Sequence, residues 1–216
     1  MNGDAMRLYT ITGTRESIKK LNTMNVGLLI SEIWRDPGKW PFFALDNGCY
    51  AAFSHGAEWD PSPFLKHLSR CRDKGLRPDF VVIPDRPLSK DSLDFSKKWY
   101  PVLKTMYPDF PYYLAVQDGM APEDVEDIDG IQGIFVGGSM DWKLESMKAW
   151  IDYAHSKGMG CHVGRIGPIQ RMLMCELAGA DSIDSTTWVQ RKGGIEKYIG
   201  GYMAQRKNEE HTEVSE

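Results

Sequence analysis

The sequence has few cysteines and no long apolar run. Its four cysteines (Cys49, Cys71, Cys161 and Cys175) lie far apart in 216 residues and form no CxxC pair. This excludes both a disulfide framework and a zinc site built on paired cysteines. No apolar stretch is long enough to cross a membrane, and the start, MNGDAMRLYT, lacks the basic and apolar regions of a signal peptide. These absences predict a cytoplasmic protein with reduced thiols and no membrane contact.

An excess of positive charge is also absent. The chain has 26 Lys and Arg against 30 Asp and Glu, which gives a net charge of −4. This balance argues against a nonspecific coat on nucleic acid, but a local basic patch is still compatible with it. Candidate phosphate contacts near the ends of predicted strands are Arg86, Lys90, Lys143, Arg165, Arg191 and Lys192.

Short apolar runs alternate with segments of helical periodicity. The runs 7–12, 26–31, 42–46, 80–85, 111–117, 133–138, 159–164 and 180–184 predict strands, and 60–74, 89–107, 143–157, 168–179 and 193–206 predict helices. The segment 32–41 is too short and broken for a normal helix. This order predicts an α/β fold, a compact (β/α)8 TIM barrel over residues 1–207, with a disordered polar tail at 208–216. A doubly wound sheet is the competing architecture.

The predicted strands end, one after another, on polar or glycine residues. In chain order these are Asp46, Asp85, Gln117, Gly137 with Gly138, the segment 162–165 with His162 and Arg165, and Asp184. The carboxyl ends of all strands of such a barrel meet on one face, where the loops build the active site. We therefore expect these side chains to gather in one cup.

The ordered motifs LDNGCY, VIPDRP, LAVQDGM, FVGGSM, HVGRIG and DSIDST, within residues 42–188, resemble the tRNA-guanine transglycosylase superfamily. The motifs DNG and HVGR, followed by DSIDST, are most similar to its small phage and bacterial branch, the DpdA-like transglycosylases, which place 7-deazaguanines in DNA. The resemblance implies replacement of guanine in DNA by a 7-deazaguanine such as the 7-cyano form. It also implies a location in the host cytoplasm if the protein is phage-encoded.

Two carboxylates would carry this chemistry. Asp184 matches the nucleophile that attacks C1′ of the nucleotide, and Asp46 matches the acid that moves a proton on or off the bases. A carboxylate beneath C1′ can stabilise the positive charge that develops on the sugar and capture it as a covalent intermediate. The mechanism needs no metal and no organic cofactor.

Other residues would bind the substrate. The resemblance implies that Asp85, Gln117 and the backbone N–H groups around Gly137 and Gly138 read the guanine edge, with Asn47 next to the acid. His162 and Arg165 are candidates for contact with phosphate or ribose. A target base in a duplex would be flipped out to enter this pocket. A helper protein and a homodimer are both left open.

The residues also have simpler interpretations. The DNG sequence and Asp118–Gly119 are ordinary turn sequences, and Asp85 could pair with Arg86. His162 in an apolar strand is more often a core histidine. The Cys-rich zinc insertion of the larger tRNA enzymes has no counterpart in 193–216, so we predict no zinc.

Three alternatives for function remain open. The first is the same base exchange on tRNA, or hydrolysis by an N-glycosidase. The second is a noncatalytic barrel subunit that binds nucleic acid or a partner enzyme. The third is a phosphate-binding isomerase or aldolase with its phosphate at 164–168, which would need a catalytic Lys or Glu at a strand end; the sequence pattern indicates none.

Overall fold

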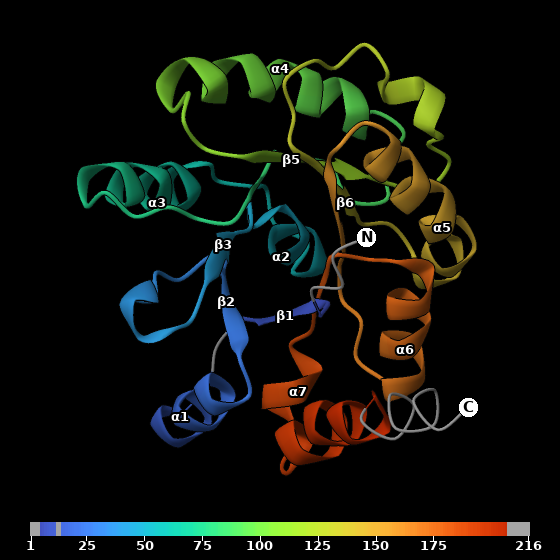
Figure 1. Ribbon diagram of the computed structural model, residues 1–216. Coiled ribbons are helices and arrows are strands. Elements are labelled where there is room, and N and C mark those ends of the chain that lie inside the picture. The colour runs from blue at the N-terminus through green and yellow to red at the C-terminus, as the bar shows by residue number, and fades with distance from the viewer. Residues whose placement is uncertain (1–4, 12–13, 207–216) are drawn as a thin grey trace.

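Eight parallel strands close into a barrel in chain order, with β1 paired to both β2 and β8 (Figure 1). The computed structural model describes residues 5–11 and 14–206. The strands are β1 (Arg7–Thr10), β2 (Val26–Ile30), β3 (Phe43–Leu45), β4 (Val81–Val82), β5 (Tyr112–Val116), β6 (Gly133–Val136), β7 (Gly160–Val163) and β8 (Ser182–Asp184). This confirms the predicted (β/α)8 barrel and excludes the doubly wound sheet. Residue 12 of the predicted first strand and the predicted tail 208–216 lie outside the described residues.

Helices cover the outside of the barrel (Figure 1). They are α1 (Arg15–Thr23), α2 (Cys49–Ser54), α3 (Ser62–Asp73), α4 (Ser92–Met106), α5 (Met140–Ser156), α6 (Ile169–Ala178) and α7 (Thr187–Gln190), with the short 3-10 helices η1 (Pro37–Lys39) and η2 (Pro122–Val125) and a π-helix, η3 (Ile195–Gly200). The broken segment 32–41 contains only η1, as expected. The prediction missed α1, α2 and α7. The six residues of α2 and the four of α7 are too few to show a helical period.

Several strands are shorter than predicted. The run 80–85 forms ladder pairs only at Val81 and Val82. Pro84 has no N–H to donate, so a regular ladder cannot continue through it. The chain beyond β4 is therefore free to turn, and it carries Asp85 to the carboxyl end of the barrel.

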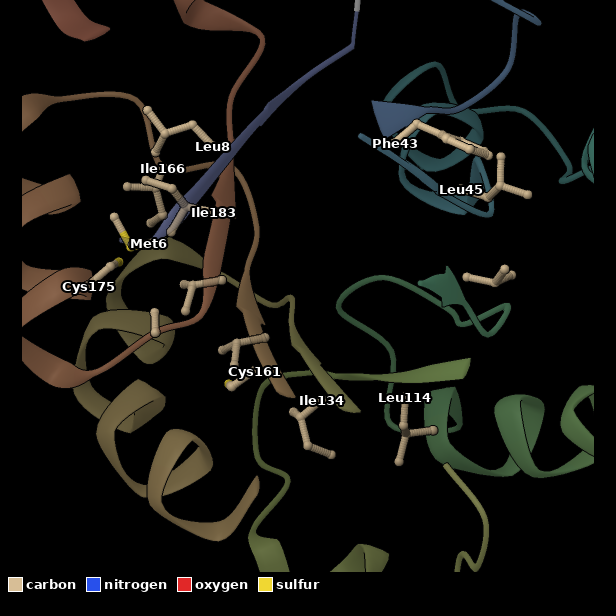
Figure 2. Close-up of a cluster of buried hydrophobic side chains, with 14 of the residues drawn as sticks. Met6, Leu8, Phe43, Leu45, Leu114, Ile134, Cys161, Ile166, Cys175 and Ile183 are labelled. Carbon is tan, nitrogen blue, oxygen red and sulfur yellow. The ribbon is translucent and has the colours of Figure 1, made fainter. Parts of the chain in front are cut away.

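Alternation along the strands divides the apolar side chains into two layers. The outer layer lies between barrel and helices and includes Leu8, Leu45, Leu114, Ile134 and Ile183 (Figure 2). The inner layer fills the barrel and consists of Tyr9, Leu29, Ala44, Phe80, Val82 and Ala115. Neighbouring residues on a strand point to opposite faces.

This alternation sets the direction of the residues that follow the strands. Leu45 and Ile183 face outward, so Asp46 and Asp184, one position later, face the barrel axis. Ser31, directly after β2, and Gln117, directly after β5, follow outward-facing Ile30 and Val116 in the same way. Four strands thus deliver polar side chains to one level above the apolar interior.

The amino-terminal half of the barrel interior depends on two glycines. A Cβ at Gly160 would lie 2.1 Å from the hydroxyl oxygen of Tyr113, and a Cβ at Gly133 would lie 2.3 Å from its ring. We expect Gly160→Ala to lower the free energy of unfolding by about 1–3 kcal/mol through overpacking. Chemical denaturation would measure this loss.

Tyr113→Phe provides the control. It removes the oxygen that Gly160→Ala would meet but leaves the ring that Gly133→Ala would meet. The double variant Gly160→Ala/Tyr113→Phe should recover stability relative to Gly160→Ala, and Gly133→Ala/Tyr113→Phe should not recover it relative to Gly133→Ala. Equal recovery in both would show that the ring moves freely.

Candidate active site

A cavity of about 510 Å³ opens at the carboxyl end of the barrel. Its floor is apolar and includes Leu29, Val82, Ala115 and Phe135. Eight of the nine residues predicted for the site line it: Asp46, Asn47, Asp85, Gln117, Gly137, Gly138, Arg165 and Asp184. This volume lies within the range of small-molecule sites. The polar residues at the strand ends therefore gather in one place, as the sequence predicts.

His162, the ninth predicted residue, lies beneath the cavity. It is fully buried and stacks on Phe135 with ring centroids 4.7 Å apart. Burial lowers the pKa of its imidazole, so the ring is neutral. The ring holds Asp184 and does not reach a phosphate or ribose in the cavity, so the expected contact with substrate does not fit this position.

Hydrogen bonding determines which nitrogen of His162 carries the proton. Its Nε2 lies 3.0 Å from Asp184 Oδ1 and its Nδ1 lies 2.8 Å from Ser182 Oγ. An ionised carboxylate can only accept, so Nε2–H donates to Asp184 and Nδ1 accepts from the Ser182 hydroxyl. The imidazole thereby fixes the orientation of the Asp184 carboxylate.

The two oxygens of Asp184 have different surroundings. Oδ1 accepts hydrogen bonds from His162 Nε2 and, at 3.1 Å, from the backbone N–H of Arg165. None of the described residues donates a hydrogen bond to Oδ2. The side chain is only 8% exposed, and that small exposed part faces the cavity. Oδ2 is therefore available to a ligand.

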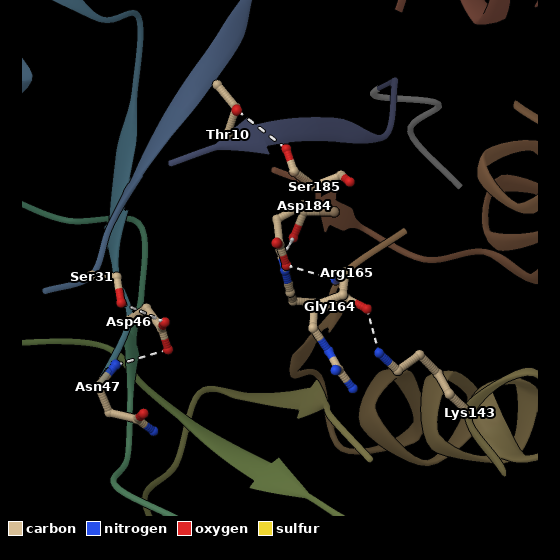
Figure 3. A network of polar contacts seen from close by, with 11 residues as sticks. Thr10, Ser31, Asp46, Asn47, Lys143, Gly164, Arg165, Asp184 and Ser185 are labelled. Atoms are coloured by element: carbon tan, nitrogen blue, oxygen red, sulfur yellow. Dashed lines mark hydrogen bonds and ion pairs between the residues drawn. The ribbon is translucent and has the colours of Figure 1, made fainter. Parts of the chain in front are cut away.

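Asp46 lies at the end of β3, in a different part of the cavity wall from Asp184 (Figure 3). Ser31 Oγ donates to Asp46 Oδ2 at 3.0 Å, and the Asn47 N–H donates to Oδ1 at 2.8 Å. Burial, followed by the negative charge of Asp184, raises the pKa of Asp46 to about 7. Asp46 is thus poised to exchange a proton near neutral pH. Sequence reasoning missed Ser31, because no motif marks the end of β2.

Asp85 is held by two amides. Asn47 Nδ2 donates to Oδ1 at 2.8 Å, and Gln117 Nε2 donates to Oδ2 at 2.6 Å. Burial raises the pKa of Asp85 to about 6, and both amide hydrogen bonds limit the rise. The expected ion pair with Arg86 does not form, because Arg86 Nη1 contacts Asp91 instead. Asp85 belongs to the cavity and not to a surface ion pair.

The glycine pair after β6 differs in detail from the expectation. The Gly137 N–H donates to the Val116 carbonyl at 2.9 Å, and the Gly138 N–H donates to Gln117 Oε1 at 2.9 Å. Both donors are therefore engaged and not free for a guanine oxygen. The glycines are needed for space, since a Cβ at Gly137 would lie 2.6 Å from Gln117 Nε2. The unshared N–H of the Gln117 amide is the donor that remains on this wall.

Arg165 follows β7 in a left-handed conformation, with φ of 61°. Its guanidinium carbon lies 4.0 Å from the ring centroid of Tyr50 on α2, and Nη2 contacts the carbonyl of Gly138. These contacts hold the Arg165 guanidinium group in the wall of the cavity. Sequence reasoning did not include Tyr50, because α2 was not predicted.

Lys143, one of the candidate phosphate contacts, is buried. Lys143 is fully buried on α5, and its amine contacts the carbonyl of Gly164 (Figure 3). It cannot bind a phosphate backbone, and it does not line the cavity, so it does not supply the lysine of an aldolase. Trp188 is also fully buried, with Nε1 donating to the Gly167 carbonyl at 2.9 Å.

The described part of the chain has neither a metal-binding cluster nor a membrane-spanning helix. No group of three or more His, Cys, Asp or Glu side chains there is arranged to hold a metal ion. No helix among the same residues has the length and apolarity that crossing a membrane requires. The absence of a zinc requirement stays a prediction.

The chain was also compared with known proteins. No protein-family model matches it, and no curated protein sequence matches it significantly.

Proposed function

We propose that the protein is a base-exchange transglycosylase that replaces guanine in DNA with a 7-deazaguanine, such as the 7-cyano form. The observation that carries the proposal is the pair of unlike carboxylates in one cavity. Asp184 has a free Oδ2 beside a fixed Oδ1, and Asp46 has a pKa of about 7. A nucleophile and a proton carrier are the two groups that exchange at C1′ requires.

The first half of the reaction breaks the bond between C1′ and the guanine nitrogen. Asp184 Oδ2 forms a bond to C1′, and the electron pair of the glycosidic bond leaves with the base. The protonated Asp46 gives its proton to the departing guanine. The product is an ester between Asp184 and the sugar, as in retaining glycosidases.

The second half reverses these steps with another base. Asp46, now ionised, takes a proton from the incoming 7-deazaguanine, whose ring nitrogen attacks C1′ and releases Asp184. A pKa near 7 suits a group that has to give a proton and then accept one. The polymer keeps its backbone throughout.

The part of the cavity wall formed by Asp85 and Gln117 has groups that can recognise the edge of a guanine base. The Asp85 carboxylate can accept from the N1–H and 2-amino donors of a guanine-like base, and the free N–H of Gln117 can donate to O6. The apolar floor, which includes Phe135 and Ala115, suits the face of a flat ring. Both bases of the exchange share this edge.

The polymer is assigned as DNA because the motifs resemble the DNA-modifying branch. Only a flipped-out nucleotide can enter a cavity at the end of a barrel. We place the reaction in the cytoplasm, with a helper protein or a second copy of the chain as optional partners.

Incorporation of radiolabelled guanine into polymer tests the proposal. Purified protein is incubated with single-stranded DNA, duplex DNA and tRNA in parallel, with Asp184→Asn as the blank. The expected result is label in DNA that is absent with the variant. Label in tRNA alone would overturn the choice of DNA.

Two further outcomes are informative. Release of free base without incorporation would identify an N-glycosidase. Absence of both label and release in all three polymers, with a 7-deazaguanine supplied as well, would favour the noncatalytic subunit and overturn the proposal.

A further inference from the structure

Lys143 is a buried charge that the proposed mechanism does not yet use. It lies in the first turn of α5 and is 0% exposed. Its amine has one hydrogen-bond partner among the described residues, the carbonyl oxygen of Gly164. Burial of an ammonium group costs free energy, and a single carbonyl offsets little of that cost. A methionine of similar length would fill the same space without the cost, so packing alone does not explain the lysine.

The carbonyl that Lys143 contacts belongs to the peptide group that holds Asp184. The oxygen of this peptide comes from Gly164, and its N–H comes from Arg165. That N–H donates to Asp184 Oδ1 at 3.1 Å (Figure 3). Lys143 and Asp184 are therefore joined by the two ends of one rigid peptide plane.

The peptide requires support from its surroundings. Arg165 has φ of 61°, a left-handed conformation that costs a non-glycine residue free energy. A Cβ at Gly164 would lie 2.8 Å from the ring of Phe135, so the carbonyl side is also closely packed. A hydrogen bond from Lys143 on the carbonyl opposes rotation of this peptide away from Asp184.

We propose that Lys143 is a positioning residue for Asp184. Its ammonium group polarises and orients the Gly164–Arg165 peptide, so that the Arg165 N–H stays on Asp184 Oδ1 and keeps the carboxylate aimed at C1′. Hydrogen bonds in a chain strengthen one another, and a charged donor at one end increases the effect at the other. The catalytic part of this inference rests on the proposed function of Asp184.

The charges around Lys143 are consistent with this role. The titratable groups that act on its amine or are influenced by it are Arg165, Asp184, Asp118, Cys175 and His162. Burial and the Arg165 charge lower the pKa of Lys143 to about 7, whereas Asp184 raises it.

The test compares Lys143→Met with Lys148→Met. Lys148 lies on the same helix but is exposed and paired with Asp152, so it is a matched control. Carbon-13 NMR of labelled aspartate carboxyls follows the resonance of the Asp184 carboxyl carbon, assigned by its loss in Asp184→Asn. We expect Lys143→Met to move this resonance and Lys148→Met to leave it unchanged, because only Lys143 contacts the peptide that holds the Asp184 carboxylate.

Kinetics and stability complete the test. Lys143→Met should lower kcat by at least about 10-fold with little change in KM, while Tm changes by less than about 4 °C. Lys143→Gln keeps a donor for the Gly164 carbonyl without the charge, and it should recover part of the loss. An unchanged Asp184 carboxyl resonance in Lys143→Met, or a loss of kcat matched by a large fall in Tm, would overturn the proposal.

A measurement on the unmodified protein keeps the test valid if the variants do not fold. The chemical shifts of the Arg165 backbone amide should change with pH as the Lys143 amine titrates. If these shifts do not follow the titration of Lys143, the proposed coupling between Lys143 and the peptide is wrong. If the wild type exchanges no base but the Asp184 carboxyl resonance moves in Lys143→Met, the link between Lys143 and Asp184 holds and only the proposed function fails.

Discussion

Asp184→Asn is expected to lower the rate of guanine exchange by at least about 10³-fold, a loss of more than about 4 kcal/mol of transition-state stabilisation. The amide oxygen can still accept from His162 Nε2 and the Arg165 N–H, so the fold and the cavity should be preserved. The amide nitrogen replaces the free oxygen Oδ2 and cannot form the ester with C1′. The loss should therefore be confined to chemistry, with Tm close to that of the wild type.

Asp181→Asn is the matched control. Asp181 lies three residues earlier but faces away from the cavity, where Oδ2 accepts from the Cys161 N–H and contacts His155. This variant should keep exchange activity within a few-fold of the wild type.

Denaturing electrophoresis after acid quenching should also reveal a protein–polymer adduct in the wild type that Asp184→Asn lacks. An adduct of equal yield in Asp184→Asn would refute the assignment of the nucleophile.

Asp46→Asn is expected to have two opposite effects. Exchange should fall by about 10²–10⁴-fold, because no group remains to move the proton. Stability above pH 7 should rise, because the variant removes a carboxylate whose charged form is disfavoured by burial and by Asp184. An active-site residue that costs stability is typical of a functional group held for chemistry.

The sign of the pH effect follows from the raised pKa. Between about pH 4, the value for an unfolded Asp, and about pH 7 the folded protein keeps a proton on Asp46 that the unfolded chain has lost. This contribution is fully present below about pH 4 and is lost as pH rises through 7, so wild-type stability declines across that window. Asp46→Asn does not share this decline. Asp85 titrates in the same direction in both proteins and cancels from the difference.

Urea denaturation at several pH values measures this difference. Above pH 7 the variant should be more stable by about 2 kcal/mol, roughly half of what the full pKa difference implies because Asp46 is partly exposed. Near pH 4 the two proteins should be equally stable. A constant difference at all pH values would mean that Asp46 does not titrate with a raised pKa.

The barrel could be predicted because it depends on a repeated local pattern. Apolar runs alternate with helical segments, and Asp46, Gln117 and Asp184 each lie one position beyond an outward-facing side chain. That position is enough to send Asp46 and Asp184 inward. The motif order then predicted which side chains share the cavity, since the strands close in chain order.

The contacts inside the cavity could not be predicted, because they depend on backbone orientation between elements. Nothing in FVGGSM indicates that the Gly138 N–H donates to Gln117 and not to a ligand. Lys143 occupies the first turn of a helix, where a charged residue is usually solvated, and only the packing of α5 against the end of β7 buries it. His162 likewise has its role through Ser182 and Asp184, which neighbour it only in the folded barrel.

The hydrogen bonds within the cavity wall that would recognise the base have a consequence for turnover. Asp85, Asn47, Gln117 and Gly138 satisfy one another before any ligand arrives, and the Leu88 N–H adds a second donor to Gln117 Oε1 at 3.2 Å. A ligand edge thus meets a wall whose hydrogen bonds are already made, so each new contact adds little net free energy. Under the proposed exchange, the outgoing and incoming bases share this wall, and an enzyme that held either one tightly would stall. Because these four residues hydrogen-bond to one another, the wall keeps its shape without a ligand. This favours repeated binding and release of bases over retention of a single base.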